Sequence, residues 1–362
     1  MQPIQGSLSA DKPVNEPGFY RLKRFYQLKR FYNPKLGSNC AEIHYLKFIM
    51  PFFSRDNALQ TTGEQILEKT WKTFPSLARN QVAMTWLVYD PPTFVNTGGA
   101  LTPAEFWQRS VRGFSYRGVE CIYPASVAKL FYLVAAHEWL QQNMVAGSAE
   151  LDRALRDMIV DSSNDATSLV VDILTGTTSG PELPPAPFET WKQQRNIINR
   201  YFQSLQWEEF ATINICQKTW GDGPYGRERA FYGENLANRN RLTSDATARL
   251  LHSIVGGVAV SADRSQQMMR LLARSLDPRE LAADPENQVV GFIGGGLPPM
   301  AQIWSKAGWM SQARHDAAYV EIPGQLPFLL VIFTEGRENS ANEELLPFIT
   351  QQVVEQLPSL QS

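Results

Sequence analysis

The chain has 362 residues, of which 43% are hydrophobic and 19% are charged, a composition typical of globular proteins that excludes disordered, collagen-like and coiled-coil chains. The 34 basic residues nearly balance the 36 acidic ones, so the formal charge of -2 gives no reason to expect a nucleic-acid or anionic-membrane partner. No uncharged apolar run approaches the roughly 18 residues of a membrane-spanning helix, so no transmembrane segment is expected.

Residues 1–49 differ in composition from the rest and are expected to be a basic extension, disordered or non-native, with Met50 as a candidate true start. The hexapeptide RLKRFY at 21–26 is followed at once by QLKRFY, but two copies are too few to build a repeat fold. An arm that binds nucleic acid or lipid is the less favoured alternative. Without a visible signal peptide a cytoplasmic protein is expected, or a periplasmic one if a different start hides an export signal.

From residue 60 onward, hydrophobic patterns predict regular elements along the chain. A helix over 63–74 comes first, followed by strands over 81–90 and 116–124. The helix over 126–142 is apolar on nearly all sides and is therefore expected to be buried. Further helices are predicted over 150–159, 164–175, 189–205, 244–257 and 263–276. Three strand-like runs and a final helix close the chain at 301–310, 315–322, 327–335 and 342–357.

This order predicts an α+β fold, in which strands from both chain ends form one antiparallel sheet flanked by helices. Residues 60–123 and 245–358 would make up the α/β sub-domain, and residues 124–244 an inserted, all-helical sub-domain. No pattern in the sequence predicts the oligomeric state.

The cysteine and histidine content argues against a metal site. Three cysteines without a CxxC spacing fit neither a disulfide framework nor a thiolate site, and the four histidines form no HxxxH pair. The GxSxG, GxxxxGK[ST] and GxGxxG motifs are absent as well. We therefore expect neither a metal nor an organic cofactor.

Three short motifs follow one another in the chain: Ser126-Val-Ala-Lys129, Ser162-Ser-Asn164 and Lys306-Ala-Gly308. Each is short enough to arise by chance, so the argument depends on their positions. Ser126 stands at the start of the most apolar helix, and Lys129 follows one turn later on the same face. A serine hydroxyl needs a base to attack an acyl group, and a desolvated lysine has a lowered pKa that suits this role.

Each motif also has a purely structural interpretation. Ser126 could be a helix N-cap, with Lys129 extending its charge to solvent, although a lysine inside so apolar a helix is then unexplained. Ser162 and Asn164 could be ordinary helix caps. Lys306 could protect an edge strand from aggregation.

In this order, SxxK, SxN and KxG resemble the motifs of the penicillin-recognising serine enzymes, which include class A β-lactamases and D-alanyl-D-alanine peptidases and transpeptidases. The resemblance covers about residues 60–358 and is strongest to serine hydrolases related to class A β-lactamases. Three longer segments share it: ALRDMIVDSSNDATSLVVDIL, RLTSDATARLLHSIVGG and GGGLPPMAQIWSKAGW. The resemblance implies the β-lactamase/transpeptidase-like fold.

The resemblance also implies catalytic roles. Ser126 would be the acylated nucleophile, Lys129 its proton acceptor, and Ser162 the relay that passes the proton to the leaving nitrogen.

Substrate-binding roles follow in the same way. Asn164 would hydrogen-bond the amide side chain of the substrate, and Lys306 would supply positive potential for a substrate carboxylate. The backbone N–H of Trp309, after Gly308, would complete the oxyanion hole together with that of Ser126. One such donor is typically worth about 3 kcal/mol.

The sequence departs from the family pattern in three places. Ala307 removes a hydroxyl that in the family helps to bind the substrate carboxylate, and a hydrogen bond to a charged group is worth about 1.5–3 kcal/mol. Ser162 follows Ser126 by only 36 positions, and Ser163 replaces the usual Asp, which is closer to the peptidases. The glutamate that activates the deacylating water has no clear counterpart. Glu228 and Glu234 are the nearby loop candidates, and solvated loop carboxylates are the favoured interpretation of both.

We therefore expect a serine hydrolase that acts through an acyl-enzyme on a small-molecule substrate, a β-lactam or a related carboxylate-bearing amide or ester. A D-alanyl-D-alanine peptidase, a transpeptidase-like enzyme or an esterase is an alternative. A catalytically silent binding protein of the same fold is another, because Ala307 and the missing glutamate would both weaken catalysis.

Overall fold

The computed structural model describes residues 52–90 and 98–360, and the structural statements below concern these residues. The expectation for residues 1–49 lies outside them.

A single sheet of seven strands lies at the centre of the described part of the chain, in the order β1-β3-β2-β7-β6-β5-β4. The strands are β1 (Phe53–Arg55), β2 (Val82–Val88), β3 (Val111–Tyr116), β4 (Ala273–Arg274), β5 (Gln302–Met310), β6 (Ala313–Glu321) and β7 (Phe328–Glu335). β2 from the N-terminal part pairs antiparallel with β7 from the C-terminal part, which confirms the predicted α+β fold. The sheet is mixed rather than wholly antiparallel, because β1 runs parallel to β3.

The predicted strand over 116–124 is wrong, because β3 ends at Tyr116. The next residue, Arg117, has a φ of 51°, and a Cβ on Gly118 would lie 2.2 Å from Oδ1 of Asp245, so a tight turn carries the chain off the sheet. Beyond this turn Ile122 forms an isolated bridge with Leu242. The segment that leads to Ser126 is therefore held by another loop and not by the sheet.

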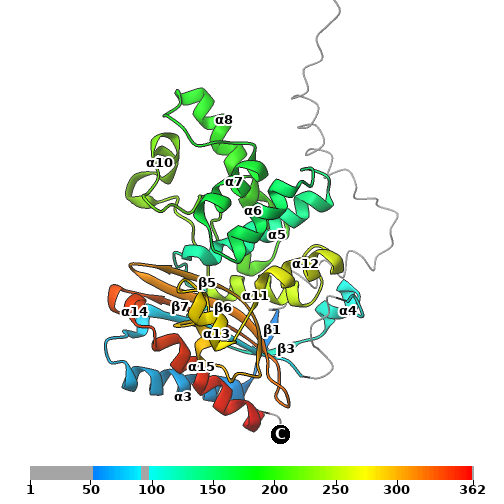
Figure 1. The fold of residues 1–362 in the computed structure, drawn as a ribbon, viewed down its shortest axis with the longest axis vertical. Helices are drawn as coiled ribbons and strands as arrows, with labels where there is room; N and C mark the ends of the chain where they lie inside the picture. Colours follow the sequence, from blue (N-terminus) through cyan, green and yellow to red (C-terminus); the bar gives the residue numbers. More distant parts are fainter. Residues whose placement is uncertain (1–51, 91–97, 361–362) are drawn as a thin grey trace, which may run out of the picture. The chain divides into compact units, whose positions relative to one another are not determined.

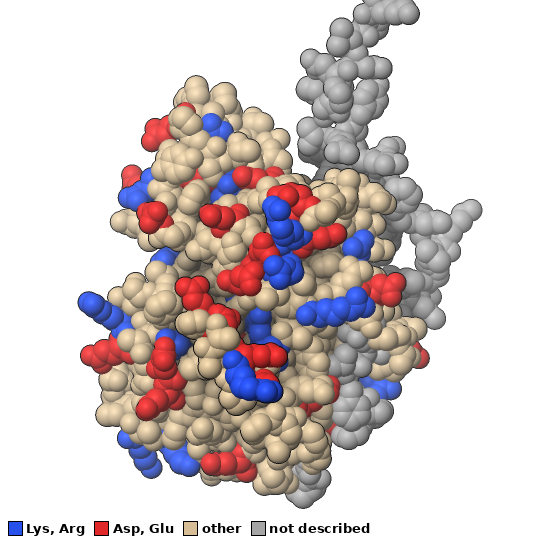
Figure 2. All heavy atoms as spheres, in the orientation of Figure 1, with Lys and Arg blue, Asp and Glu red and all other residues tan. Residues whose placement is uncertain are grey.

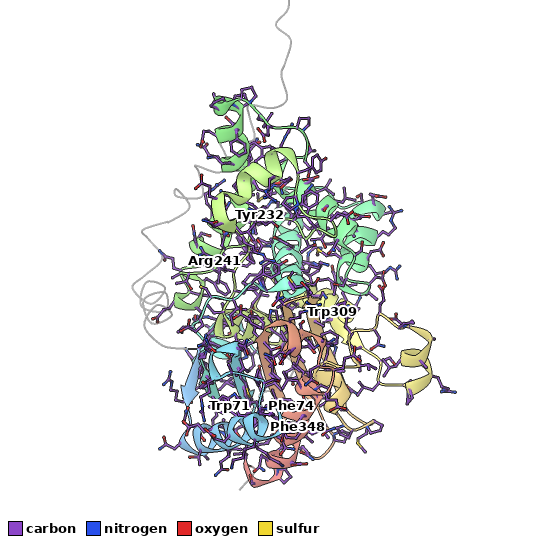
Figure 3. The ribbon with its side chains drawn as sticks, turned by 90° about the vertical axis from the view of Figure 1, so that its left-hand side faces the viewer. Trp71, Phe74, Tyr232, Arg241, Trp309 and Phe348 are labelled. Atoms are coloured by element: carbon purple, nitrogen blue, oxygen red, sulfur yellow. The ribbon has the colours of Figure 1, made fainter. Side chains whose placement is uncertain are left out.

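Helices cover both faces of the sheet (Figure 1). On one face α3 (Asn57–Thr73) packs against α15 (Leu345–Gln356). Phe74, directly after α3, meets Phe348 of α15 edge to face, with ring centroids 5.3 Å apart (Figure 3). On the other face α11 (Ser244–Val255) contacts β2, β6 and β7.

Strand β2 shows how the sequence supplies two hydrophobic cores. Successive side chains of a strand point to opposite faces. Met84 and Trp86 accordingly join the core beneath α3 and α15, whereas Ala83 and Leu87 join the core on the other face. Because both faces are covered, this strand is buried throughout and Thr85 is its only polar residue, so it lacks the alternation of a half-exposed strand.

The segment between β3 and α11 is mainly helical and contains α5 (Ala128–Gln141), α6 (Ala149–Ile159), α7 (Asn164–Thr175), α8 (Pro185–Arg195), α9 (Ile197–Ser204) and α10 (Gly226–Tyr232). Apolar residues bury α5 on nearly all sides, as predicted. The single helix predicted over 189–205 is instead two helices, α8 and α9, which break at Asn196. There the side-chain amide and the backbone N–H of Asn196 both donate to the carbonyl of Lys192, at 3.1 Å and 3.0 Å.

Four further helices complete the described chain: α4 (Pro103–Gln108), α12 (Ala262–Leu272), α13 (Pro278–Ala283) and α14 (Arg337–Ala341). The helix predicted over 263–276 ends early, since residues 273–274 leave it to pair with β5 as the edge strand β4. No helix in the described ranges is long and apolar enough to cross a membrane.

Candidate active site

Ser126 lies in a short 3-10 turn, η2 (Ala125–Val127), at the entrance to α5. The φ of Ala125 is 46°, a strained conformation for a residue with a Cβ. Val127 occupies the N-cap position of α5, so Ser126 does not cap this helix. The Ser126 side chain is half-buried, and its hydroxyl forms no hydrogen bond with any residue that the structure describes.

Strand β5 passes directly against the Ser126 backbone. A Cβ on Gly308 would lie 2.9 Å from the backbone nitrogen of Ser126 and 2.8 Å from the carbonyl oxygen of Pro124, so only glycine permits this approach. The next residue, Trp309, has a 61% exposed side chain whose Nε1 donates to the carbonyl of Ser340 at 2.9 Å. The two backbone segments that the expected oxyanion hole requires are thus adjacent.

Lys129 is completely buried in the first turn of α5. Its Nζ donates to the carbonyl and the Oγ of Ser162, the latter at 3.2 Å, and to Oδ1 of Asn164 at 3.0 Å. All of these acceptors are neutral, and burial lowers the pKa of Lys129 to about 7. Lys129 is therefore not a snorkelling lysine but an amine that gains and loses its proton near neutral pH.

Ser162 and Asn164 are directed at Lys129 by the turn between α6 and α7. Ser162 has a φ of 53°, again in the left-handed region. Ser163, between them, is the residue that caps α7, because its Oγ accepts from the backbone N–H of Ala166 at 3.1 Å. This cap leaves the side chains of Ser162 and Asn164 free for Lys129.

Lys306 approaches the same serine from β5. Its Nζ donates to Oγ of Ser162 at 3.0 Å, to the carbonyl oxygen of the next residue, Ala307, at 2.7 Å, and to Oε1 of Gln288. Lys306 is completely buried, and burial together with the nearby positive charge of Lys129 lowers its pKa well below the usual value. We call Lys129, Ser162, Lys306 and Gln288 the lysine cluster.

Gln288 is a member of this cluster that no sequence motif indicated. Its Oε1 also accepts from the backbone N–H of Ala307 at 3.3 Å, while its Nε2 donates to the carbonyl of Val160 at 2.8 Å. Arg274 makes a second link of the same kind, from Nη2 to the carbonyls of Ile159 at 2.9 Å and Ser305 at 3.0 Å. These bonds tie β5, which carries Lys306, to the end of α6, just before Ser162.

One buried carboxylate, that of Asp316, lies near Lys306 but does not hydrogen-bond to the lysine cluster. Asp316 is completely buried on β6, where its oxygens accept from the backbone N–H groups of Ile293 at 3.0 Å and Ala317 at 2.8 Å. Burial raises the pKa of Asp316 to about 7. Within the described residues, no carboxylate makes a hydrogen bond to Lys129, Ser162 or Lys306.

Glu228 is not the solvated loop carboxylate that was expected. It is completely buried on α10, where it pairs with Arg195 of α8 at 2.7 Å and accepts from Ser179 at 2.8 Å. Arg195 also pairs with Asp172 at 3.3 Å, and Lys218 pairs with Asp172 at 2.8 Å. We call Asp172, Arg195, Lys218 and Glu228 the ion-pair network. The lysine cluster and Glu228 share no hydrogen bond.

Glu234 is exposed at the start of the 3-10 turn η4 (Glu234–Leu236), as expected for a solvated carboxylate. The described residues contain no group of His, Cys, Asp and Glu side chains arranged to hold a metal ion. Figure 2 shows basic and acidic side chains interspersed over the visible face, without a large patch of one sign. The polar groups that could perform chemistry together are thus those around Ser162, and Gly308 of β5 lies against the Ser126 backbone.

Comparison with known families finds a match in sequence. The sequence model of the beta-lactamase enzyme family matches residues 142–357, which is more than half of the chain. Ser162, Asn164 and the β5 motif fall inside this range, whereas Ser126 and Lys129 precede it. No curated protein sequence matches.

Solved structures with the same architecture agree with this match. A β-lactamase from Sphaerobacter thermophilus is 16% identical, with a TM-score of 0.55 over 81% of this chain and 97% of the other. A point mutant of PBP-A, solved as an acyl-enzyme complex with penicillin G, is 15% identical, with a TM-score of 0.56 over 86% of this chain and 100% of the other. A β-lactamase from Chitinophaga pinensis is 13% identical, with a TM-score of 0.55 over 83% and 100%. At these identities the similarity establishes the fold alone.

Proposed function

Because the chain belongs to the beta-lactamase enzyme family, we propose that it is a serine hydrolase that forms an acyl-enzyme on Ser126. The observation that carries this proposal is the lysine cluster. Two completely buried lysine amines meet at one serine hydroxyl, and neither has a hydrogen-bonded carboxylate partner. Such an arrangement keeps an amine ready to accept a proton, which a structural lysine does not require.

Acylation would proceed through three proton transfers. The Ser126 oxygen bonds to the carbonyl carbon of the substrate while its proton moves to neutral Lys129, one helical turn away. The resulting oxyanion is stabilised by the backbone N–H groups of Ser126 and Trp309, beside the close approach at Gly308. The carbon–nitrogen or carbon–oxygen bond of the leaving group then breaks. The leaving atom takes the proton of the Ser162 hydroxyl. Lys129 then gives a proton to Ser162, whose Oγ lies 3.2 Å from the lysine Nζ.

The second step, in which water hydrolyses the acyl-enzyme, is proposed to be slow. Glu228 is held by Arg195 and Ser179, and Glu234 is exposed in η4, so neither is placed to activate a water at Ser126. This favours a long-lived acyl-enzyme, as in a penicillin-binding peptidase, over the rapid turnover of a β-lactamase. The presence of Ser163 in place of Asp agrees with the peptidase side of the family.

The test is the intact mass of the protein during incubation with benzylpenicillin and, in parallel, with an activated ester. We expect a covalent adduct that appears on the wild-type protein, is absent from Ser126→Ala and decays slowly. Rapid decay with released penicilloate would instead identify an efficient β-lactamase.

Absence of any adduct and any product with both reagents would contradict the proposal and leave the catalytically silent binding protein. An adduct that persists in Ser126→Ala would contradict the assignment of the nucleophile. Thermal unfolding of both proteins is the control for folding.

A further inference from the structure

The buried state of Lys306 leaves substrate recognition incomplete. The family resemblance assigns to this lysine the positive potential for a substrate carboxylate, yet its side chain is completely buried and its pKa is lowered well below the usual value. Its three bonds go to Ser162, Gln288 and the carbonyl of Ala307, all within the protein. A substrate anion beside Ser126 would therefore need another cation.

Arg239 is a half-buried cation that is not neutralised by a carboxylate. Its guanidinium carbon lies 3.3 Å from the ring centroid of Tyr123, and its Nη2 contacts the sulfur of Met310 at 3.5 Å. No Asp or Glu of the described chain forms an ion pair with it. A stacked guanidinium presents its N–H donors at its edge, and these suit the two oxygens of a carboxylate.

The two residues that Arg239 contacts place it beside the reacting serine. Tyr123 precedes Ser126 by three positions, and its carbonyl accepts from Nε2 of His315, the residue opposite Gly308 in the sheet. Met310 ends β5, two residues beyond Gly308. Lys306 lies on the other side of Gly308 along the same strand, so a substrate lying along β5 would have Arg239 and Lys306 at opposite ends.

The backbone that carries Arg239 is fixed before any ligand binds. Asn214 donates from Nδ2 to the carbonyl of Arg239 at 2.9 Å. The next residue, Asn240, accepts through Oδ1 from the backbone N–H groups of Cys216 at 3.0 Å and Gln217 at 2.9 Å. Leu242 then pairs with the chain just before Tyr123. A rigid backbone presents the guanidinium at little entropic cost.

We propose that Arg239, stacked on Tyr123, forms a binding subsite for a carboxylate on the acyl part of the substrate, at the Met310 end of β5. This inference rests on the proposed acyl transfer at Ser126 and names its substrate class: amides, lactams or esters with an acidic acyl group.

The test compares two penicillins that differ by one carboxylate on the acyl side chain, benzylpenicillin and its α-carboxyl derivative carbenicillin. Binding is measured by calorimetry in a Ser126→Ala background, where acylation cannot interfere. We expect carbenicillin to bind roughly tenfold tighter than benzylpenicillin, with a preference that weakens as salt is added. Arg239→Gln should abolish the preference and Arg239→Lys should keep part of it.

Arg241→Gln is the matched control, because Arg241 is exposed on the same segment and lies apart from Trp309 in Figure 3. It should keep the preference. Equal binding of the two penicillins in Ser126→Ala, a lack of binding by both, or a preference that survives Arg239→Gln would each overturn the inference. Acylation of Ser126, measured by mass on proteins with the serine intact, reports separately on the proposed function. Equal unfolding temperatures of the variants confirm that they are folded.

Discussion

The lysine cluster and the ion-pair network both bury charged side chains, and they differ in how the charge is balanced. In the ion-pair network two cations meet two carboxylates: Arg195 and Lys218 pair with Asp172 and Glu228. In the lysine cluster two cations bond only to neutral groups. Helix α7 connects the two, since it begins at Asn164 and carries Asp172 two turns later.

This difference separates a structural use of buried charge from a chemical one. The ion-pair network joins α7, α8 and α10 through its paired charges. An unpaired buried amine is destabilised in its charged form, and it therefore titrates near neutral pH. The burial that lowers the pKa of Lys129 to about 7 is what makes it useful as a base. Five perturbations test this comparison.

Replacement of Lys129 should have the largest effect on reactivity. Lys129→Met keeps the length and burial of the side chain but removes the base, so the rate of Ser126 acylation should fall by about a thousandfold. Stopped-flow or time-resolved intact mass would measure it.

The same substitution removes a buried amine that is costly to charge, so the protein should not lose stability at neutral pH. A rate within threefold of the wild type would mean that Lys129 is structural. Lys129 would then play the same structural part as the paired charges of the ion-pair network.

Breaking the ion-pair network should affect stability far more than chemistry. Arg195→Met leaves Glu228 buried without its 2.7 Å partner, which should lower the free energy of unfolding by about 3–5 kcal/mol. Urea unfolding followed by fluorescence would measure this loss.

The double variant Arg195→Met/Glu228→Gln is the matched control, because it removes both charges. It should recover part of the stability lost in the single variant. If the double variant is less stable than Arg195→Met alone, the network is not held by this pairing.

Much of the fold follows from local sequence patterns, because long periodic segments fix their own structure. The apolar helix at 126–142 and the three C-terminal strands are found as α5, β5, β6 and β7. The strand predicted over 116–124 fails for a tertiary reason. Gly118 packs against Asp245, a residue far away in the chain, and this contact ends the strand at Tyr116.

The site is predictable only where its residues stand in short motifs. Ser162 and Lys306 stand in such motifs and meet in space. Gln288 stands in a loop without periodicity, and its role depends on that loop lying beside both Lys306 and Val160. Burial of Glu228 depends on Arg195, 33 positions earlier, so a rule based on the usual exposure of glutamate fails.

The pH dependence tests whether the lysine cluster titrates. Lys129 must be neutral to accept the Ser126 proton, and burial places its pKa at about 7, so the acylation rate should rise with pH through about 7 and then level off. Because this pKa is lower in the folded protein, the unfolded chain binds more protons above pH 7. Stability should therefore rise with pH from about 7 to the pKa of an unfolded lysine, roughly 10.4.

A charge placed beside Lys306 should move this profile. Gln288→Glu puts a carboxylate where Oε1 now accepts from Lys306, which should shift the midpoint upward by roughly one pH unit. Gln288→Leu loses the same bonds to Val160 and Ile159 without adding charge. The difference in midpoint between the two variants therefore measures the effect of the added charge. Identical midpoints would show that a charge at position 288 does not change the pKa of Lys129.

The smallest expected effect concerns the N-cap of α7, the helix that connects the lysine cluster to the ion-pair network. Ser163→Ala removes the acceptor for the Ala166 N–H, 3.1 Å away, which should cost about 1 kcal/mol of unfolding free energy. Ser163→Asp should restore this stability, because Asp is an equally good N-cap and its charge suits a helix N-terminus. Its charge also lies next to Ser162 and Asn164, so it should raise the pKa of Lys129 and slow acylation below pH 7. If instead Ser163→Asp is no more stable than Ser163→Ala, the cap does not anchor this end of α7. The turn would then be held mainly by the bonds from Lys129 to Ser162 and Asn164.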